Sequence, residues 1–334
     1  MENCSAAPEA SAFTKPSAAG AVRRAVIDVG TNSVKLLVAD VRGATVFPLL
    51  ERSEQTRLGR GFYETHRLQP DTIQQTARAV AAFAAVAKLL QPVSTRVIAT
   101  SAAREAVNQN ELLAAIRTAS SLQAEIISGD TEADWAFRGV TTNLALANVP
   151  LLIVDVGGGS TEFILGQGSV RLFSRSFPIG SVRLLERFPV SDPPTESERI
   201  HLQVWLEEFL TREVEPELAP RLKKLNTGEI RLIGTGGTST ILARVRTGLN
   251  DFDRDRIEDV RLERESVFAE TMRFWKLSLV ERKKIIGLPP NRADVILAGS
   301  AIWLAIMERF NFFKAGVSTR GLRFAALLDT TSVT

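Results

Sequence analysis

The chain has 334 residues, 45% of them hydrophobic, and a formal net charge of +3 from 41 Lys and Arg against 38 Asp and Glu. This length suggests two domains, and the hydrophobic content is sufficient for a sizeable core. The small positive excess tolerates an anionic substrate but gives no case for nucleic-acid binding. The one cysteine, Cys4, cannot form an internal disulfide, so we expect a reducing, cytoplasmic compartment.

Several other classes of protein are disfavoured by the sequence. The first 20 residues are small and polar, with neither a basic start nor an apolar centre, so we expect a disordered tail over 1–20 and no secretory signal. No apolar run approaches the roughly 20 residues that span a bilayer, so no membrane partner is expected. The two histidines, His66 and His201, have no Cys, Asp or Glu at metal spacing. Chemistry must therefore come from carboxylates, arginines and backbone amides.

One kind of turn occurs twice, as DVGTNS over 28–33 and as DVGGGST over 155–161. Each copy lies between two apolar runs, AVIDV and VKLLVAD around the first and LLIVDV and EFILG around the second. The unit is therefore strand, turn, strand. In dinucleotide-binding and P-loop motifs, by contrast, the glycine-rich turn opens a helix. The repetition suggests two related half-molecules that face one ligand.

The turns have the composition of a phosphate cradle. Glycine permits positive φ and close backbone approach, so successive N–H groups can form a concavity for phosphate oxygens, and the hydroxyl and amide side chains add donors. Asp28 and Asp155 would repel a phosphate unless a hard cation such as Mg²⁺ lies between them. The alternative is a pair of ordinary hairpin turns. The candidate phosphate-binding residues of the two turns are Gly30, Thr31, Asn32, Ser33, Gly157, Gly158, Gly159, Ser160 and Thr161.

Helices and strands alternate between the two turns. The apolar spacing predicts a helix over 70–91, a strand over 95–100, a helix from 101 to 119 and a strand over 123–128. Thr100 or Ser101 can cap the second helix, which has Arg104 in its first turn. Gly129 ends the last strand and Asp130 can cap a further helix, with Glu132 in its first turn. Such alternation indicates an α/β class with mixed sheets.

The second half continues this pattern. It contains a helical stretch near 195–225, a strand over 229–234, a helix over 291–310 and a closing element over 317–328. The strand leads into the glycine cluster GTGGTST at 234–240, which opens a helix. A strand followed by a glycine turn and a helix N-terminus suits phosphate or nucleotide approach, which makes Gly236 and Gly237 candidates. The alternative is a tight connection that binds no ligand.

These motifs together resemble the exopolyphosphatase and guanosine pentaphosphate phosphohydrolase family, within the actin, Hsp70 and sugar-kinase superfamily. The resemblance spans about residues 23–328. It rests on VIDVGTNSVKLLV, ATSAAREA, IISGDTEA, IVDVGGGSTEF, PIGSVRL, NRADVILAGSAI and VSTRGLR. It implies two duplicated ribonuclease-H-like domains around a central cleft, at 21–132 and 133–316, with 317–330 as a segment that could complete the first. It also implies Mg²⁺-dependent removal of terminal phosphate from polyphosphate or from pppGpp.

The resemblance also implies roles for individual residues. Glu132 matches the carboxylate that activates water as general base, and Arg104 matches an arginine that contacts phosphate. Asp28, Asp155 and Glu162 match positions that hold the cation directly or through water, so Asp155 joins Glu132 and Arg104 in the catalytic set. Without the motif, Glu132 would be interpreted as an acidic residue at a helix start.

Two departures from the family pattern stand out, and two other activities stay open. The closing motif, commonly GLREG, is GLRFA here, and Ala298 replaces the usual proline before Gly299. These departures put domain packing or substrate fit in question more than catalysis.

The glycine cluster at 234–240 motivates transfer of phosphate to ADP in place of water. The sequence shows no C-terminal helical region of the kind that long relatives carry, which motivates an alarmone sensor with little turnover. Relatives are often homodimers, so a homodimer is also an expectation.

Overall fold

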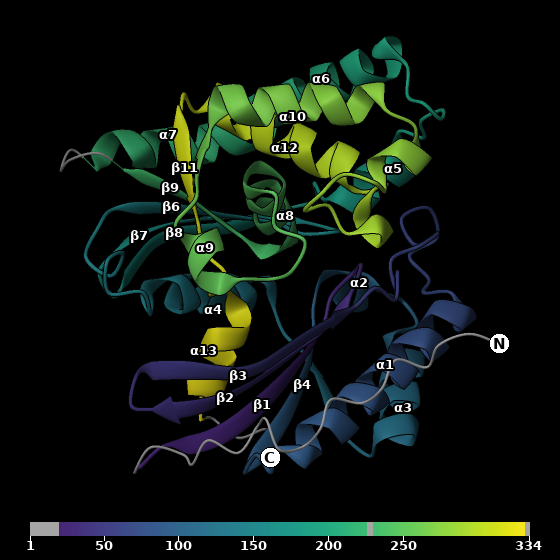
Figure 1. The fold of residues 1–334 in the computed structure, drawn as a ribbon, viewed down its shortest axis with the longest axis vertical. Helices are drawn as coiled ribbons and strands as arrows, with labels where there is room; N and C mark the ends of the chain where they lie inside the picture. The colour runs from purple at the N-terminus through teal and green to yellow at the C-terminus, as the bar shows by residue number, and fades with distance from the viewer. Residues whose placement is uncertain (1–19, 226–229, 331–334) are drawn as a thin grey trace.

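The structure is a computed structural model that describes residues 20–225 and 230–330. The predicted tail, apart from Gly20, lies outside the described residues, and so does the first residue of the strand predicted over 229–234. The described chain forms two lobes, each built on a mixed sheet (Figure 1). No helix in these two ranges is long and apolar enough to cross a membrane.

The first lobe contains a five-stranded sheet in the order β3-β2-β1-β4-β5. Strands β1, β2 and β3 are antiparallel, whereas β4 and β5 join parallel to β1. Strand β3 was not predicted, because Pro48 and its charged residues disguise it. It is an edge strand with a register shift opposite Val38 and Ala39, a position where proline is tolerated. The strands are β1 (Val22–Val29), β2 (Val34–Arg42), β3 (Thr45–Glu54), β4 (Ser94–Ala99) and β5 (Ala124–Ile126).

The second lobe repeats this topology in a six-stranded sheet, ordered β10-β11-β9-β6-β7-β8. The antiparallel set β6, β7 and β8 corresponds to β1, β2 and β3, and the parallel strands β9 and β11 correspond to β4 and β5. The predicted duplication of an α/β unit with mixed sheets is thus confirmed. The strands are β6 (Leu151–Val156), β7 (Thr161–Gln167), β8 (Val170–Phe177), β9 (Arg231–Thr235), β10 (Arg261–Glu263) and β11 (Lys314–Val317).

Helices cover the outer face of each sheet, as Figure 1 shows. The helix predicted from 101 is two helices, because the backbone becomes extended at Ala106. The first lobe carries α1 (Pro70–Leu89), α2 (Ser101–Glu105) and α3 (Gln109–Ser120). The second carries α5 (Ser181–Arg187), α6 (Glu196–Phe209), α7 (Glu215–Lys224), α8 (Gly236–Thr247), α9 (Arg254–Glu258), α10 (Arg264–Lys276), α11 (Leu279–Arg282) and α12 (Ile296–Arg309), with a π-helical turn at Leu210–Val214 and a 3₁₀ turn at Pro290–Arg292.

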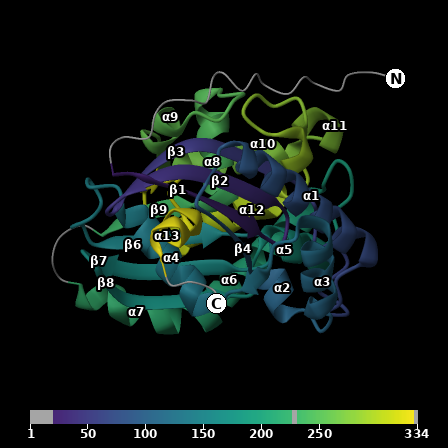
Figure 2. The same ribbon diagram turned by 90° about the horizontal axis from the view of Figure 1, so that it is seen from below.

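Two further helices, α4 (Gly129–Thr141) and α13 (Leu322–Leu328), lie between the sheets (Figures 1 and 2). Helix α4 packs on the inner face of the second sheet through Ala136, Phe137 and Val140. Helix α13 packs on the inner face of the first sheet, and the two helices contact each other. They cross so closely at Gly139 that a Cβ there would overlap the carbonyl of Gly321. The layers are therefore sheet, helix α13, helix α4 and sheet. Each repeated turn lies at the end of two central strands, and the two turns are neighbours.

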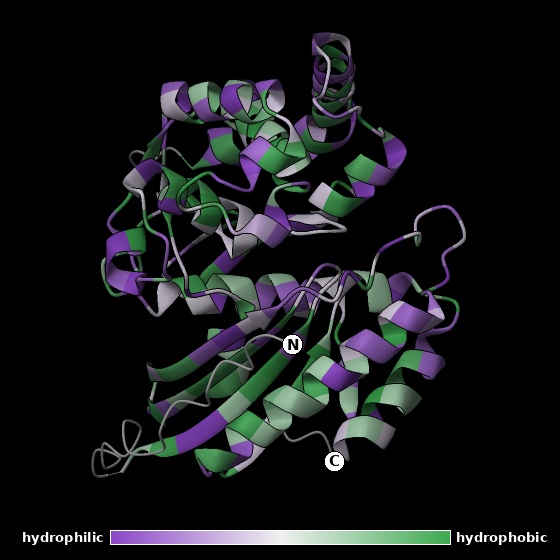
Figure 3. Cartoon of the chain, turned by 45° about the vertical axis from the view of Figure 1, so that its right-hand side comes forward, coloured by the Kyte–Doolittle hydropathy of each residue, from purple (hydrophilic) through white to green (hydrophobic). Residues whose placement is uncertain are grey.

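The central strands of both sheets are buried on both faces. In β6, Leu152, Val154 and Val156 face the outer helices, whereas Leu151 and Ile153 face α4. This two-residue alternation within an apolar run is typical of central strands that are covered on both sides. Figure 3 shows the apolar residues that run along the strands of both lobes. These runs explain why the sequence predicts β1, β2, β6 and β7 so readily.

The two departures from the family pattern fall in these packed layers. Phe324 of GLRFA is buried in the core beneath the first sheet, with the Arg254 guanidinium over its ring at 4.8 Å. Ala325 is fully buried beside it. Ala298 lies in the first turn of α12 and is also fully buried. All three residues are apolar at buried positions, so they fit the packing of this chain.

Candidate active site

The two repeated turns have the same backbone bond. The amide of Gly30 donates to the carbonyl of Ser33 at 3.0 Å, and the amide of Gly157 donates to the carbonyl of Ser160 at 2.9 Å. Of the two possibilities that glycine offers, positive φ and close approach, the turns do not use positive φ, because Gly30, Gly157, Gly158 and Gly159 all lie outside that region. Close approach is the reason for glycine instead. A Cβ on Gly158 would stand 3.1 Å from the Cβ of Thr31 in the opposite turn.

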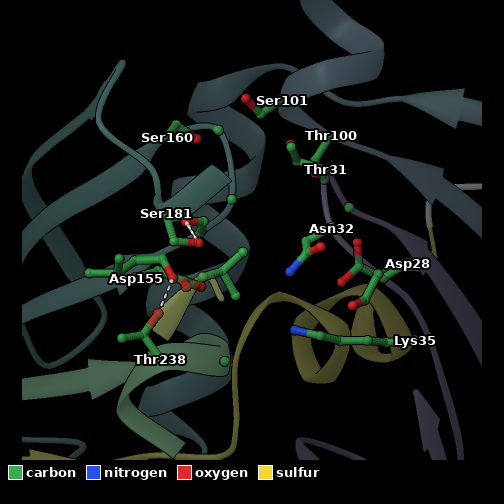
Figure 4. Close-up of a pocket in the computed structure, with 18 of the residues that line it drawn as sticks. Asp28, Thr31, Asn32, Lys35, Thr100, Ser101, Asp155, Ser160, Ser181 and Thr238 are labelled. Atoms are coloured by element: carbon green, nitrogen blue, oxygen red, sulfur yellow. Dashed lines mark hydrogen bonds between the residues drawn. The ribbon is translucent and has the colours of Figure 1, made fainter. Parts of the chain in front are cut away.

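A cavity of about 100 Å³ lies between the turns. In Figure 4, Asp28, Thr31, Asn32 and Lys35 form one wall, and Asp155, Ser160, Ser181 and Thr238 face them from the other lobe. The structure thus brings most of the predicted site residues to one place. The predicted residues that line this cavity are Asp28, Gly30, Thr31, Asn32, Ser33, Glu132, Asp155, Gly157, Gly158, Gly159, Ser160, Glu162 and Gly237.

Three predicted site residues do not line this cavity. The side chain of Thr161 is fully buried, and its hydroxyl donates to the carbonyl of Ile179 at 2.6 Å. Gly236 has positive φ (83°) and packs directly against the Asp155 carboxylate, on the side of a neighbouring cavity of about 380 Å³. Arg104 contacts the Glu132 carboxylate but is not among the residues that line the cavity. Arg104 and Gly236 therefore each contact a carboxylate of the site, Glu132 and Asp155 respectively, without lining the cavity.

Glu132 lies in the first turn of α4, where only 8% of its surface is exposed. The helix is capped by Ser128, whose hydroxyl accepts from the Thr131 amide, and not by Asp130 as predicted. Arg104 donates to the Glu132 carboxylate at 2.9 Å and to the carbonyl of Ile127 at 3.1 Å. Burial, and then repulsion from Glu162, raises the pKa of Glu132 well above its ordinary value, although Arg104 opposes the shift. A carboxylate with such a pKa suits general-base chemistry near neutral pH.

Each hairpin carries a pair of ionisable residues directly across its two strands. Asp28 pairs with Lys35 in the first hairpin, and Asp155 pairs with Glu162 in the second. Burial raises the pKa of Asp28, which the charge of Lys35 opposes. Burial and then the neighbouring Glu162 raise the pKa of Asp155 to about 7. The cavity is therefore acidic on one side and partly neutralised by lysine on the other.

Two cationic residues of the cavity were missed by the sequence analysis. Burial lowers the pKa of Lys35, and the negative charges of Asp28 and Asp155 oppose this shift. Lys35 also lines the cavity. Lys35 could have been predicted from the sequence, because antiparallel pairing across a short turn places it opposite Asp28. Arg292, from the turn before α12, donates to the Ser33 hydroxyl at 2.5 Å across the lobes. No local pattern indicates that contact, because residues 33 and 292 meet only in the folded chain.

The predicted cation site can be tested against the side chains present. In the two described ranges, no three His, Cys, Asp or Glu side chains converge as a metal-binding group. However, the Oδ1 atom of Asp28 is buried without a hydrogen-bond partner, as a cation ligand would be. Glu162 is held by the hydroxyls of Ser160 and Ser176, both at 2.7 Å. This donor set fits Mg²⁺, which keeps waters and substrate oxygens in most of its coordination positions.

The repeated turns and the duplicated mixed sheets define an α/β protein with an actin-like fold. The family model of the Ppx/GppA phosphatase family matches residues 37–332, and the chain belongs to that family. It is therefore a phosphoanhydride hydrolase. Exopolyphosphatase 2 of Mycobacterium tuberculosis is 35% identical over 321 residues, covering 92% of this chain and 96% of that protein.

Solved structures of relatives have the same fold. The Aquifex aeolicus PPX-GPPA enzyme is 31% identical and superposes with a TM-score of 0.73, covering 92% of this chain and 99% of the other. An exopolyphosphatase from Cytophaga hutchinsonii is 27% identical with a TM-score of 0.80, covering 91% and 96%. The predicted pair of ribonuclease-H-like units is therefore confirmed as the fold class.

Proposed function

We propose that this enzyme removes the terminal phosphate of inorganic polyphosphate, with Glu132 as the general base. The observation that carries the proposal is the single cavity in which two phosphate-type turns face each other with Glu132 in the wall. The relative with 35% identity is an exopolyphosphatase, which supports the same substrate class. Cysteine usage further favours a cytoplasmic location.

The chain's own residues divide the work. Backbone amides of the turns, with the hydroxyl of Thr31, bind the terminal phosphate oxygens. Lys35 and Arg292 offset charge that develops on the transferred group, as positive groups do in other phosphoryl transfers. Glu132 accepts the proton of the attacking water. Arg104 orients that carboxylate through its 2.9 Å bond, so it acts chiefly as a positioning residue, although the family resemblance gives it a phosphate contact.

Magnesium belongs to the proposal as the cofactor. Asp28 and Asp155, with Glu162 through water, would hold the ion, and the unpartnered Oδ1 of Asp28 supports this assignment. When bound, Mg²⁺ would neutralise phosphate charge and so reduce repulsion from the acidic residues.

The cavity beside the site favours pppGpp as a second candidate substrate. It has a volume of about 380 Å³ and shares Asp28, Asp155 and Gly237 with the phosphate cavity. Its lining includes Phe252 and Arg244, an aromatic ring and a guanidinium that suit a nucleoside. The same cavity would also bind ADP as a phosphate acceptor, or an alarmone that is bound without turnover.

The test is phosphate release from polyphosphates of several lengths and from pppGpp, with Mg²⁺ and with a chelator. We expect Mg²⁺-dependent release from polyphosphate and a loss of about 10³ in kcat for Glu132→Gln, within the range for a general base. The matched control is Glu125→Gln, because Glu125 also pairs with an arginine, Arg96, but away from the cavity. Full activity in Glu132→Gln would refute the mechanism. ATP formation from ADP, or tight ppGpp binding without turnover, would favour the other two activities.

A further inference from the structure

A cluster of side chains from both lobes lies beside the phosphate cavity, next to Gly159 of the second turn. The cluster consists of Tyr63, Glu105, Arg183 and Glu186, and we call it the clasp. Tyr63 lies in the loop between β3 and α1, and Glu105 ends α2, so both belong to the first lobe. Arg183 and Glu186 lie on α5 of the second lobe, which follows β8 and contacts the second turn through the Ser181 amide, a donor to the carbonyl of Gly157 at 2.9 Å. The catalytic scheme above uses none of the four.

The contacts of Arg183 join the second turn to the first lobe. Its Nε donates to the carbonyl of Gly159 at 2.6 Å. One terminal nitrogen donates to both carboxylate oxygens of Glu105 at 2.8 Å, and the guanidinium lies 4.1 Å from the centre of the Tyr63 ring. A single side chain thus holds the carbonyl of the phosphate-type turn, an acid of the opposite lobe and an aromatic ring.

Glu186 adds a second connection between the lobes. Its carboxylate accepts from the amide of Gly61 at 2.6 Å and from the amide of Tyr63 at 3.3 Å. The loop that carries Tyr63 is therefore bonded to α5 through its backbone as well as its ring. Ser101, which lines the phosphate cavity, donates to Glu105 at 3.1 Å and links the clasp to the first lobe's part of the site.

The glycine of the second turn is fitted to this arrangement. A Cβ at Gly159 would overlap the hydroxyls of Tyr63 and Ser101, so only glycine fits at this position of the turn. The Tyr63 hydroxyl is buried beside Thr31 of the first turn. The clasp therefore lies against both turns.

We propose that the clasp is a positioning device, which holds the lobes closed so that the turns at Gly30–Ser33 and Gly157–Ser160 form one terminal-phosphate site. This proposal rests on the proposed function for its link to catalysis, but the closure itself can be measured without substrate. If the closed state becomes a minor population, apparent affinity falls in proportion while saturating substrate can still close the site. Weakening the clasp should therefore raise KM and leave kcat nearly unchanged.

The experiment compares Arg183→Met with the wild type by hydrogen exchange and by kinetics. Arg183→Met keeps an unbranched apolar stem and removes the guanidinium. We expect amide exchange in both turns to accelerate about ten-fold without change in α1 or α12, and KM for tripolyphosphate to rise about ten-fold with kcat within about three-fold. Glu105→Gln, a milder change, should move the same quantities in the same direction by less.

The control is Arg187→Met, on the same helix. Arg187 also stacks on aromatic rings, but those rings, of Trp205 and Phe188, belong to its own lobe. It should leave exchange in the turns and KM unchanged. Wild-type exchange rates in both turns of a folded Arg183→Met variant would overturn the proposal, and so would an unchanged KM. If the wild type hydrolyses no polyphosphate, the proposed function fails, while the exchange comparison still decides whether the clasp closes the lobes.

Discussion

The two hairpins of this enzyme have the same backbone and different chemistry. Both turns close with a glycine amide on a serine carbonyl, at 3.0 and 2.9 Å, and both follow an aspartate. Yet the residue across from that aspartate is Lys35 in the first hairpin and Glu162 in the second. The first turn also has the side-chain donors Thr31 and Asn32 where the second has Gly158 and Gly159. Duplication has therefore preserved the shape of the phosphate cradle, while the charge on its two sides has diverged.

This difference divides the work of the site. The first hairpin supplies positive charge and hydroxyl donors, so it should determine how tightly phosphate binds. The second supplies close backbone approach, and its Glu162 adds to the rise in the pKa of Glu132 that burial causes. The acidic side should determine the protonation of the base. Substitutions that make one hairpin resemble the other test this division directly.

The largest effect should follow from giving the first hairpin the charge pattern of the second. Lys35→Glu places a second acid opposite Asp28 in a partly buried cavity, where an unpaired charge costs several kcal/mol. We expect kcat/KM to fall about 10³-fold, mainly through KM, with a smaller fall for Lys35→Met. Steady-state phosphate release over a wide substrate range measures both terms. If Lys35→Glu binds substrate as the wild type does, then the lysine is not what distinguishes the hairpins.

The hairpins themselves also show what sequence could predict here. Apolar runs bury both faces of the central strands, so β1, β2, β6, β7 and the turns between them followed from local pattern. Glu132, by contrast, was predicted from the family resemblance, because its position alone indicates only an acidic residue at a helix start. Arg292 could not be predicted, since its bond to Ser33 depends on how the lobes pack. Thr161 was predicted wrongly to face phosphate, because the pattern does not show which face of β7 its hydroxyl takes.

The two turn threonines give a smaller, opposed pair of effects. Thr31 lines the cavity, whereas Thr161 donates to a backbone carbonyl inside the fold. Thr31→Val should lower kcat/KM about ten-fold with little change in stability. Thr161→Val should leave kinetics intact and lower the free energy of unfolding by about 1–2 kcal/mol, because a buried carbonyl loses its donor. Kinetics and denaturant unfolding of both variants decide the matter, and equal kinetic losses would mean that the turns use their threonines alike.

The smallest expected effect concerns the stability cost of the acidic side. The pKa of Glu132 is raised in the folded protein, so its contribution to stability is fully present below the unfolded pKa and is lost as pH rises through the folded value. Glu132→Gln cannot ionise and avoids that loss. We expect the Tm of Glu132→Gln to exceed that of the wild type by about 3 °C at pH 8, and the difference to vanish near pH 4.5. Glu125→Gln, which loses an ion pair outside the cavity, should not gain stability at either pH. A Tm difference that is the same at both values of pH would mean that Glu132 is not held at a raised pKa, and the acidic side of the cavity would then have no role in tuning the base.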